Sequence, residues 1–271
     1  MAFKRVVITG AAGRIGTALR QHLRGHYPIL RLADVASLAE TGPGEEHMKV
    51  EAGDLAQMER AMEGADGLVH LAATVGEGPW EKILNNNIIG TYNAFEAARR
   101  KGIKRVVYAS SIHVHGFYRR DQLVGADTPH RPDSRYGVSK VFGEGLARMY
   151  ADKFDMEFVC LRIASYRPKP TKLRELGTWI SPRDIAQLVR RSLDMPGVHF
   201  EILYGVSRNT RRLYYDPNAA RFGYHPEDNS EDYAAEMLKT QTFEDEPEIE
   251  RLFHAAHVGS AEFAGDVKKI V

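Results

Sequence analysis

The chain has 271 residues, with 37 lysines and arginines against 36 aspartates and glutamates, so its formal net charge is +1. A balance this even excludes bulk attraction to nucleic acid or to an acidic membrane surface. The apolar runs are far shorter than the roughly 20 residues of a membrane span, and we find no secretion-signal pattern. With one cysteine, Cys160, inside the apolar run "EFVCLRIAS", we expect a soluble cytoplasmic protein with no disulfide.

Short β-branched runs alternate with segments that have helical periodicity. We expect strands at residues 3–10, 29–34, 47–54, 66–72, 104–110 and 156–163. We expect helices at residues 14–24, 57–63, 81–101 and 136–153. This alternation predicts an α/β fold in which a doubly wound parallel sheet of the Rossmann type is covered by helices on both faces.

The helix expected at 136–153 has the clearest periodicity. Its apolar side chains recur near every 3.6 residues and form one stripe. The stripe consists of Val138, Val141, Phe142, Leu146, Met149 and Tyr150. Just upstream, Pro132 and Asp133 suit a loop that leads into the helix.

The regular alternation weakens after residue 164. The stretch "YRPKPTKLREL" is basic and broken by prolines, "SPRDIAQLVRRSL" predicts a helix capped by Ser181 with Pro182 in its first turn, and "FEILYG" predicts another strand. We therefore expect a single domain with three parts. Residues 1–163 would form the Rossmann-type core, residues 164–253 a small lid with late strands, and residues 254–271 a tail with little core signal.

A glycine-rich loop follows the first expected strand. In "VVITGAAGRIGTALRQHL", Gly10, Gly13 and Gly16 stand three positions apart and lead into a helix. Such a loop lets the backbone approach a pyrophosphate closely, and the free N–H groups of the helix start then face the phosphates. The alternative is that these glycines only shape a tight turn between strand and helix.

An acidic residue follows the glycine loop at the position where a dinucleotide-binding unit has one, the end of the second strand. Asp34 ends the second expected strand, 18 residues after Gly16, where a carboxylate can accept both ribose hydroxyls and repel a 2′-phosphate. This position favours NAD over NADP. Arg14, which could meet a 2′-phosphate, is an opposing signal, and Asp34 could also be a solvated turn residue.

Tyr136 and Lys140 stand four positions apart near a helix start, so their side chains share one face. A tyrosine with its usual pKa of about 10 is a poor base near neutral pH. A unit charge about 4 Å away stabilises a phenolate by roughly 4 kcal/mol at an effective dielectric near 20. We therefore expect Lys140 to lower the pKa of Tyr136. On spacing alone, an ordinary exposed tyrosine is the stronger interpretation.

Taken together, these motifs resemble the extended short-chain dehydrogenase/reductase family over about residues 3–230. The resemblance rests on the order of "TGAAGRIG", "GDL", "HLAA", "NNIIGTYNAFEAAR", "ASS" and "YGVSK". It implies that Ser111, Tyr136 and Lys140 are catalytic, with Ser111 preferred over Ser110 for its spacing to Gly116. The cofactor contacts that it implies are Gly10, Gly13, Arg14, Ile15, Gly16, Asp34, Asp54, Leu55, Leu71, Ala72, Ala73, Asn87, Tyr136 and Lys140. Asp54 and Leu55 would lie near adenine, and Asn87 would support the active-site helix.

Within this family the chain is most similar to the uronate dehydrogenases, which oxidise C1 of a hexuronic acid to a lactone with NAD. The similarity implies sugar contacts from Ser111, Ile112, His113, Ser165 and Arg174, with Val75 beside them. Two positions depart from that group, which usually has serine in place of Val75 and asparagine in place of Ile112. Both changes remove a polar sugar contact and leave the identity of the sugar open.

The basic stretch "SYRPKPTKLREL" predicts an acidic substrate. Arg174 can bind a carboxylate through two parallel hydrogen bonds, and Arg167, Lys169 and Lys172 add positive charge. A phosphate or sulfonate would suit the same loop, and a solvated loop would have a similar sequence. No metal is expected, since the histidines of "HVH" at 113–115 would point to opposite faces of a strand.

Other functions remain open. A sugar-nucleotide dehydratase would carry an acidic pair after the active-site serine, where this chain has Ile112 and His113. A nucleotide-sugar epimerase usually has a larger C-terminal half, and a dinucleotide sensor would not need Ser111, Tyr136 and Lys140 together. The resemblance also implies a homo-oligomer that pairs through the helices at 81–101 and 136–153.

Overall fold

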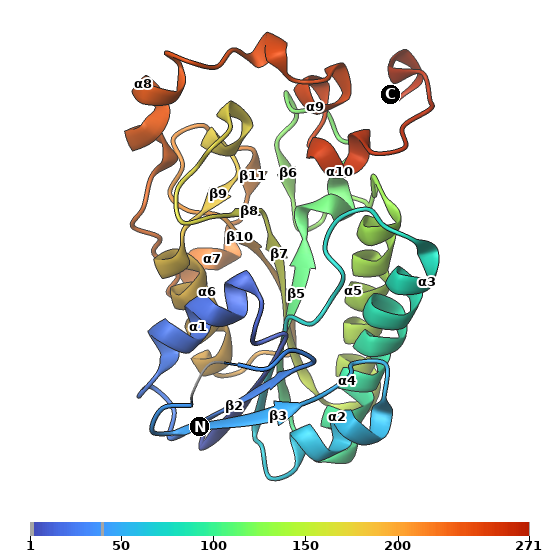
Figure 1. The fold of residues 1–271 in the computed structure, drawn as a ribbon, viewed down its shortest axis with the longest axis vertical. Helices are drawn as coiled ribbons and strands as arrows, with labels where there is room; N and C mark the ends of the chain where they lie inside the picture. The colour runs from blue at the N-terminus through green and yellow to red at the C-terminus, as the bar shows by residue number, and fades with distance from the viewer. Residues whose placement is uncertain (1–2, 39–40, 271) are drawn as a thin grey trace.

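A seven-stranded parallel sheet forms the centre of the molecule (Figure 1). The computed structural model describes residues 3–38 and 41–270, so residues 1–2, 39–40 and 271 of the predicted ranges lie outside the described residues. In sheet order the strands are β3 (Glu45–Lys49), β2 (Ile29–Asp34), β1 (Arg5–Thr9), β4 (Gly67–His70), β5 (Arg105–Ser111), β7 (Glu157–Ile163) and β10 (Phe200–Gly205). The order reverses direction between β1 and β4, as in doubly wound folds, and it confirms the predicted fold class.

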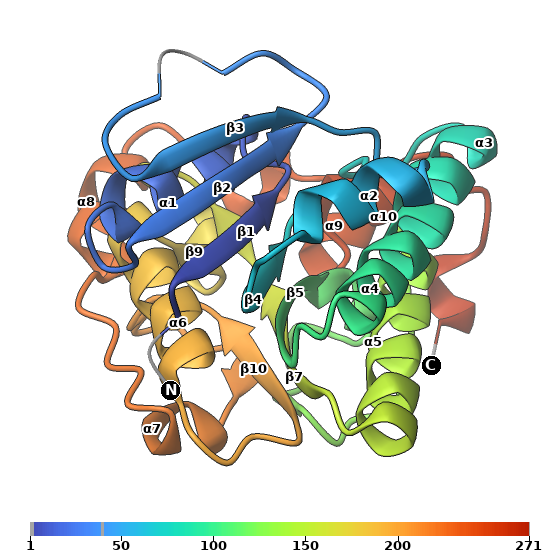
Figure 2. The ribbon, with the colours of Figure 1, turned by 90° about the horizontal axis from the view of Figure 1, so that it is seen from below.

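Helices cover both faces of the sheet (Figure 2). On one face lie α1 (Arg14–Leu23) and α6 (Pro182–Asp194), and on the other α2 (Leu55–Met62), α4 (Gly90–Arg100) and α5 (Arg135–Phe154). Because side chains alternate along a strand, neighbouring residues of β1 enter different apolar cores. Ile8 belongs to the cluster under α1 and α6, whereas Val7 belongs to the cluster under α2 and α4.

Most element boundaries agree with the prediction to within about two residues, and two places differ. The strand expected at 47–54 is β3, which begins at Glu45 and ends at Lys49. The helix expected at 81–101 is a continuous run of α3 (Trp80–Ile83), a π-helical segment (Leu84–Ile89) and α4. A π-helical segment rotates the side chains that follow it, and it often occurs at functional sites.

Half of the predicted apolar stripe of α5 faces away from the sheet, whereas Tyr150 is buried in the core beneath it. Val138, Phe142 and Met149 are 49, 36 and 40 % exposed. The face that meets the sheet instead carries small residues, including Gly143 and Ala147. At Gly143 a Cβ atom would lie 2.1 Å from the Tyr108 hydroxyl, so only glycine permits this close approach. Hydrophobic periodicity thus predicted the helix correctly but does not mark its inner face.

The later part of the chain lies largely over the carboxyl edge of the sheet (Figure 1). It contributes β10 and α6 to the core, so residues 164–253 are more than a lid. The remaining short elements are β6 (Val124–Gly125), β8 (Ser165–Tyr166), β9 (Trp179–Ile180), β11 (Tyr214–Tyr215), α7 (Asn218–Arg221), α8 (Ala234–Met237), α9 (Glu248–Leu252) and α10 (Ala256–Ser260). In the tail, Ala255 and Val258 are buried. Among the described residues, no helix is long and apolar enough to cross a membrane.

Candidate active site

A cavity of about 780 Å³ follows the carboxyl edge of the sheet. At one end it is lined by the glycine loop after β1, and at the other by residues 256–258 of the C-terminal segment. Its middle lies against the ends of β4 and β5 and the start of α5. This is the edge at which doubly wound sheets place their ligands.

The glycine loop forms a cradle packed so closely that side chains at Gly10 and Gly16 would collide with neighbouring backbone. Gly10 has φ +69°, and a Cβ atom there would lie 2.8 Å from the backbone nitrogen of Ala72. At Gly16 a Cβ atom would lie 2.5 Å from the Gly10 carbonyl oxygen. Gly13 begins α1 with no side-chain cap, so the first amides of the helix remain available. The cradle therefore fits the pyrophosphate of a dinucleotide.

Asp34 stands at the end of β2, next to this cradle. Its carboxylate accepts hydrogen bonds from the backbone amides of Ala12 and Ala36, both at 2.9 Å. These bonds hold the side chain against the loop, in the lining of the cavity. A fixed carboxylate at this place suits ribose hydroxyls and disfavours a 2′-phosphate. Arg14 also lines the cavity.

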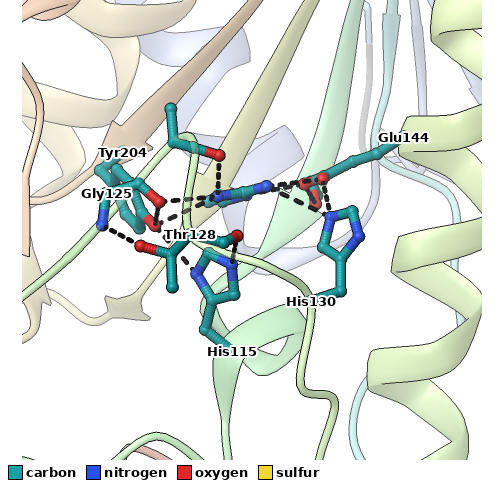
Figure 3. A network of polar contacts seen from close by, with 9 residues as sticks. His115, Gly125, Thr128, His130, Glu144 and Tyr204 are labelled. Atoms are coloured by element: carbon teal, nitrogen blue, oxygen red, sulfur yellow. Dashed lines mark hydrogen bonds and ion pairs between the residues drawn. The ribbon is translucent and has the colours of Figure 1, made fainter.

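The two serines at the end of β5 have different partners. The Ser110 hydroxyl donates to Glu144 at 2.6 Å, within a buried network. Glu144 of α5 also contacts Arg162 and His130, and the network continues to Tyr204, Gly125, Thr128 and His115 (Figure 3). The Ser111 hydroxyl instead hydrogen-bonds the Tyr136 phenol and accepts from the His113 amide at 3.3 Å. Of the two candidates, Ser111 is the one beside Tyr136.

The carboxylate in this network stays ionised. Burial alone would raise the pKa of Glu144, but hydrogen bonds from His130 and Arg162 and the charge of Arg162 lower it to about 2. Glu144 lies one helical turn after Lys140 on α5. The network therefore fixes the active-site helix to β5 and β7.

Tyr136 and Lys140 are both buried and line the cavity. The Lys140 Nζ atom lies 5.5 Å from the centre of the Tyr136 ring and donates to the Ala109 carbonyl oxygen at 2.8 Å. Burial lowers the pKa of Lys140 to about 7. For Tyr136, burial raises the pKa to about 12, against a lowering by the Ser111 hydrogen bond and with a further rise from Asp133.

The expected lowering of the Tyr136 pKa by Lys140 is therefore wrong for this arrangement. The helical spacing was correct, but it left out the cost of burying two ionisable groups side by side. Burial shifts the pKa of each group so that its neutral form is favoured, because the neutral phenol and the neutral amine need less solvation. Added positive charge near the phenol would be needed to reverse the shift.

Three predicted residues lie outside the cavity lining. Asp54 caps α2 by accepting from the Gln57 amide at 3.0 Å, and Leu55 packs beside the core under α2 and α4. Asn87, in the π-helical segment, donates to the Ser139 hydroxyl of α5 at 3.0 Å and also accepts from the Thr74 amide. Its position therefore joins the loop after β4 to the active-site helix.

The other end of the cavity brings together the residues predicted to contact a sugar. Val75, Ile112, His113, Ser165 and Arg174 all line it. Val75 is 71 % exposed at the rim. The Ser165 hydroxyl is hydrogen-bonded with that of Thr178 at 2.9 Å. Leu71, Ala72 and Ala73 border the same cavity together with Ile15.

Arg174 is a buried cation without an acidic partner. Arg174 is 6 % exposed. Its Nη2 atom donates a long hydrogen bond of 3.4 Å to the His254 carbonyl oxygen. Its Nε atom is buried with no hydrogen-bond partner among the described residues. No ion pair joins Arg174 to a carboxylate in residues 3–38 and 41–270. An uncompensated buried charge is costly, and this guanidinium keeps an unused donor beside the cavity.

The neighbouring basic residues behave differently. Arg167 is paired with Glu175 at 2.5 Å, so its charge is already compensated. Lys172 lines the cavity, while Lys169 does not. Sequence reasoning missed Ala256, His257 and Val258, which come from the tail and carry no motif. It also missed Val50, Glu51 and Ala52, although their place directly after β3 could have been a signal.

The "HVH" stretch is a 3₁₀ helix (Ile112–His115), so its placement on a strand was wrong. The two rings nonetheless have separate partners: His113 contacts Asp133, and His115 contacts Tyr204 and the Thr128 carbonyl oxygen. Within the described part of the chain, no three His, Cys, Asp or Glu side chains are grouped to hold a metal ion.

Comparison with known proteins agrees with this geometry. The sequence profile of the NAD dependent epimerase/dehydratase family matches residues 6–191. The chain belongs to this family. It is 43 % identical over 234 residues to a uronate dehydrogenase from Pseudomonas putida, covering 86 % of this chain and 87 % of the relative. It is 34 % identical over 265 residues to an NAD-dependent glucose-6-phosphate dehydrogenase from Haloferax volcanii, covering 89 % and 97 %.

A solved structure extends the family relationship to three dimensions. A uronate dehydrogenase variant from Agrobacterium tumefaciens, crystallised as a complex with NAD, superposes with a TM-score of 0.88. The two chains are 38 % identical, and the match covers 93 % of this chain and 95 % of the other. The resemblance to extended short-chain dehydrogenases, and to the uronate dehydrogenases among them, is thereby confirmed.

The separate partners of the two serines lead to a stability prediction. We expect Ser110→Ala to lower the free energy of unfolding by about 2 kcal/mol, because it removes a buried hydrogen bond to a carboxylate. Ser111→Ala is the matched control and should cost clearly less, because its hydroxyl bonds no charged group. Urea unfolding followed by circular dichroism measures both changes. Equal losses would contradict the assignment of Ser110 to the buried network.

Proposed function

We propose that this protein oxidises the C1 hydroxyl of an acidic hexose of the uronate type to its lactone, transferring the hydride to NAD. The observation that carries the proposal is Arg174, a buried guanidinium without an acidic partner in residues 3–38 and 41–270. It lines the same cavity as Ser111, Tyr136 and the glycine cradle. A carboxylate on the sugar would satisfy Arg174 and so place the rest of the ring within reach of Tyr136.

NAD is the cofactor that the loop and Asp34 support. The cradle would hold the pyrophosphate by backbone amides, and the Asp34 carboxylate would accept the ribose hydroxyls. When bound, NAD would supply the hydride acceptor. The related uronate dehydrogenase from Agrobacterium tumefaciens forms a complex with NAD, which supports the same choice here.

In the proposed reaction, the Tyr136 phenolate takes the proton from the C1 hydroxyl as hydride leaves carbon. Ser111, at the end of β5, would donate to the same oxygen and hold the phenol in place. The pKa of Tyr136, about 12 in this structure, has to be lowered for the base to act near neutral pH. A protonated Lys140 and the cationic nicotinamide ring would both lower it, since each favours the phenolate.

We expect Tyr136→Phe to reduce NADH production from glucuronate by at least about 100-fold, the usual contribution of a positioned base. NAD binding should stay near normal because the cradle and Asp34 are untouched. Absorbance of NADH measures turnover, and a fluorescence titration measures NAD affinity. Tyr215→Phe, an exposed tyrosine outside the cavity, is the control. Turnover retained by the Tyr136 variant would remove the phenol from the mechanism.

We expect Arg174→Ala to raise KM for glucuronate by roughly 10- to 100-fold, the value of a hydrogen bond to a charged group. KM for glucose, which lacks the carboxylate, should change much less. Arg212→Ala, an exposed arginine outside the cavity lining, is the matched control. Equal changes for the two sugars would show that Arg174 does not bind the anion.

A second candidate is the same oxidation on a phosphorylated aldose. Lys172 lines the cavity together with Arg174, so a dianion would find a second positive charge there. The related glucose-6-phosphate dehydrogenase from Haloferax volcanii supports this alternative. Comparing kcat/KM for glucuronate, galacturonate and glucose 6-phosphate, each with NAD and NADP, decides between the two.

We also propose that the protein is a homo-oligomer that pairs through α4 and α5. Their outward faces carry exposed apolar side chains, including Tyr92, Val138 and Phe142, and Ile89 is exposed directly before α4. Exposed apolar side chains grouped on neighbouring helices are typical of a protein interface. We place the protein in the cytosol, since its single cysteine is buried and unpaired, as a reducing compartment allows.

The oligomer proposal predicts a change in mass. We expect the wild-type protein to scatter light as a dimer or a larger assembly, and Phe142→Glu to shift it toward the monomer mass. Leu123→Glu, at an exposed apolar residue on another surface, should leave the mass unchanged. A monomeric wild-type protein would rule the interface out.

A further inference from the structure

Asp133 lies directly before α5 and has a side chain with no exposed surface. One carboxylate oxygen lies 2.7 Å from the Nδ1 atom of His113, and the other accepts from the Ser134 hydroxyl at 2.7 Å. Among the described residues, no lysine or arginine forms an ion pair with it. Because a buried carboxylate needs a partner that can stabilise its charge, the contact with His113 is strongly favoured.

Two glycines let the backbone pack closely against Asp133. At Gly116 a Cβ atom would lie 1.8 Å from the Asp133 Oδ2 atom. At Gly259, on α10, a Cβ atom would lie 3.1 Å from the Asp133 Cβ atom. Gly116 has φ −56°, an ordinary value, so glycine is required there for space and not for its backbone angle. The segments that contain Gly116 and Gly259 thus pack around Asp133, and its carboxylate contacts His113.

His113 is in turn fixed between Asp133 and Tyr136. Its ring packs edge-on against the Tyr136 ring, with 5.7 Å between the centres and an angle of 70°. Its side chain is 12 % exposed and lines the cavity. With Nδ1 taken by Asp133, the Nε2 atom has no hydrogen-bond partner in the part of the chain that the structure describes. Nε2 is therefore the atom that remains for a ligand.

We propose that Asp133 is a positioning residue of the sugar site: it holds His113 in the Nδ1–H tautomer, so that Nε2 accepts a hydrogen bond from a sugar hydroxyl beside Tyr136. An ionised carboxylate can only accept hydrogen bonds, so it requires the proton on Nδ1. The neutral ring then presents an acceptor at Nε2. This assignment rests on the proposed function in one respect, namely that a sugar enters the cavity.

Asp133→Asn tests the proposal, because an amide can either accept or donate and so no longer selects one tautomer. We expect KM for glucuronate to rise about tenfold, the value of one hydrogen bond, with NAD affinity unchanged. In a His113→Ala background the same substitution should have no further effect on KM. An equal rise in both backgrounds would overturn the proposal.

Asp216→Asn is the matched control for a purely structural role. Asp216 is a partly buried carboxylate whose partners are the backbone amides of Tyr204, Asn218 and Ala219. We expect this variant to lower the melting temperature without changing KM. If Asp133→Asn likewise changes only the melting temperature, Asp133 is structural and the proposal fails.

Nitrogen-15 NMR of the histidine rings separates this proposal from the proposed function. The wild-type spectrum, assigned with the His113→Ala variant, should show His113 protonated at Nδ1 with no sugar present. A ring protonated at Nε2 alone would overturn the positioning role even if the enzyme oxidises glucuronate. Protonation at Nδ1 without turnover of any sugar would instead support the positioning of the ring while contradicting the oxidation.

Discussion

The site depends on the buried ion pair between Glu144 and Arg162. It joins α5, which carries Tyr136 and Lys140, to β7, and through Ser110 it joins the same helix to β5 (Figure 3). A buried pair of this kind has little net effect on stability when complete, yet it is very costly when one partner is removed. The ion pair therefore fixes the register of α5 on the sheet, because the helix can pack there only where both charges are paired. The distance between Ser111 and Tyr136 follows from that register.

The close packing of α5 has a second effect on the shape of the molecule. Gly143 and Ala147 let the helix lie near the sheet, while Val138, Phe142 and Met149 face outward. The inner face is thus specified by small size and by charge pairing, and the outer face by hydrophobicity. A helix built in this way serves the active site on one side and exposes apolar side chains on the other.

Sequence patterns predicted the features that depend on local spacing. The strands, the glycine cradle, Asp34 and the grouping of Ser111 with Tyr136 and Lys140 all follow from periodicity or from motifs tied to one turn. Features that depend on distant contacts were missed. The side of α5 that meets the sheet depends on Tyr108, and the raised pKa of Tyr136 depends on burial. The tail lines the cavity together with residues that are far from it in the sequence. The family motif predicts Asp54 near adenine, and the structure adds that its side chain caps α2.

The two ends of the cavity are made from different kinds of atoms. The cradle end is backbone, held by glycines that nothing larger can replace, whereas the Arg174 end is a set of side chains from separate segments of the chain: Val75, Ile112, His113, Ser165, Arg174 and His257. A substitution in the cradle disturbs the chain itself, but one at the Arg174 end alters a single contact. During divergence, the fold can therefore change what the Arg174 end accepts through a few point changes while the cradle is inherited intact.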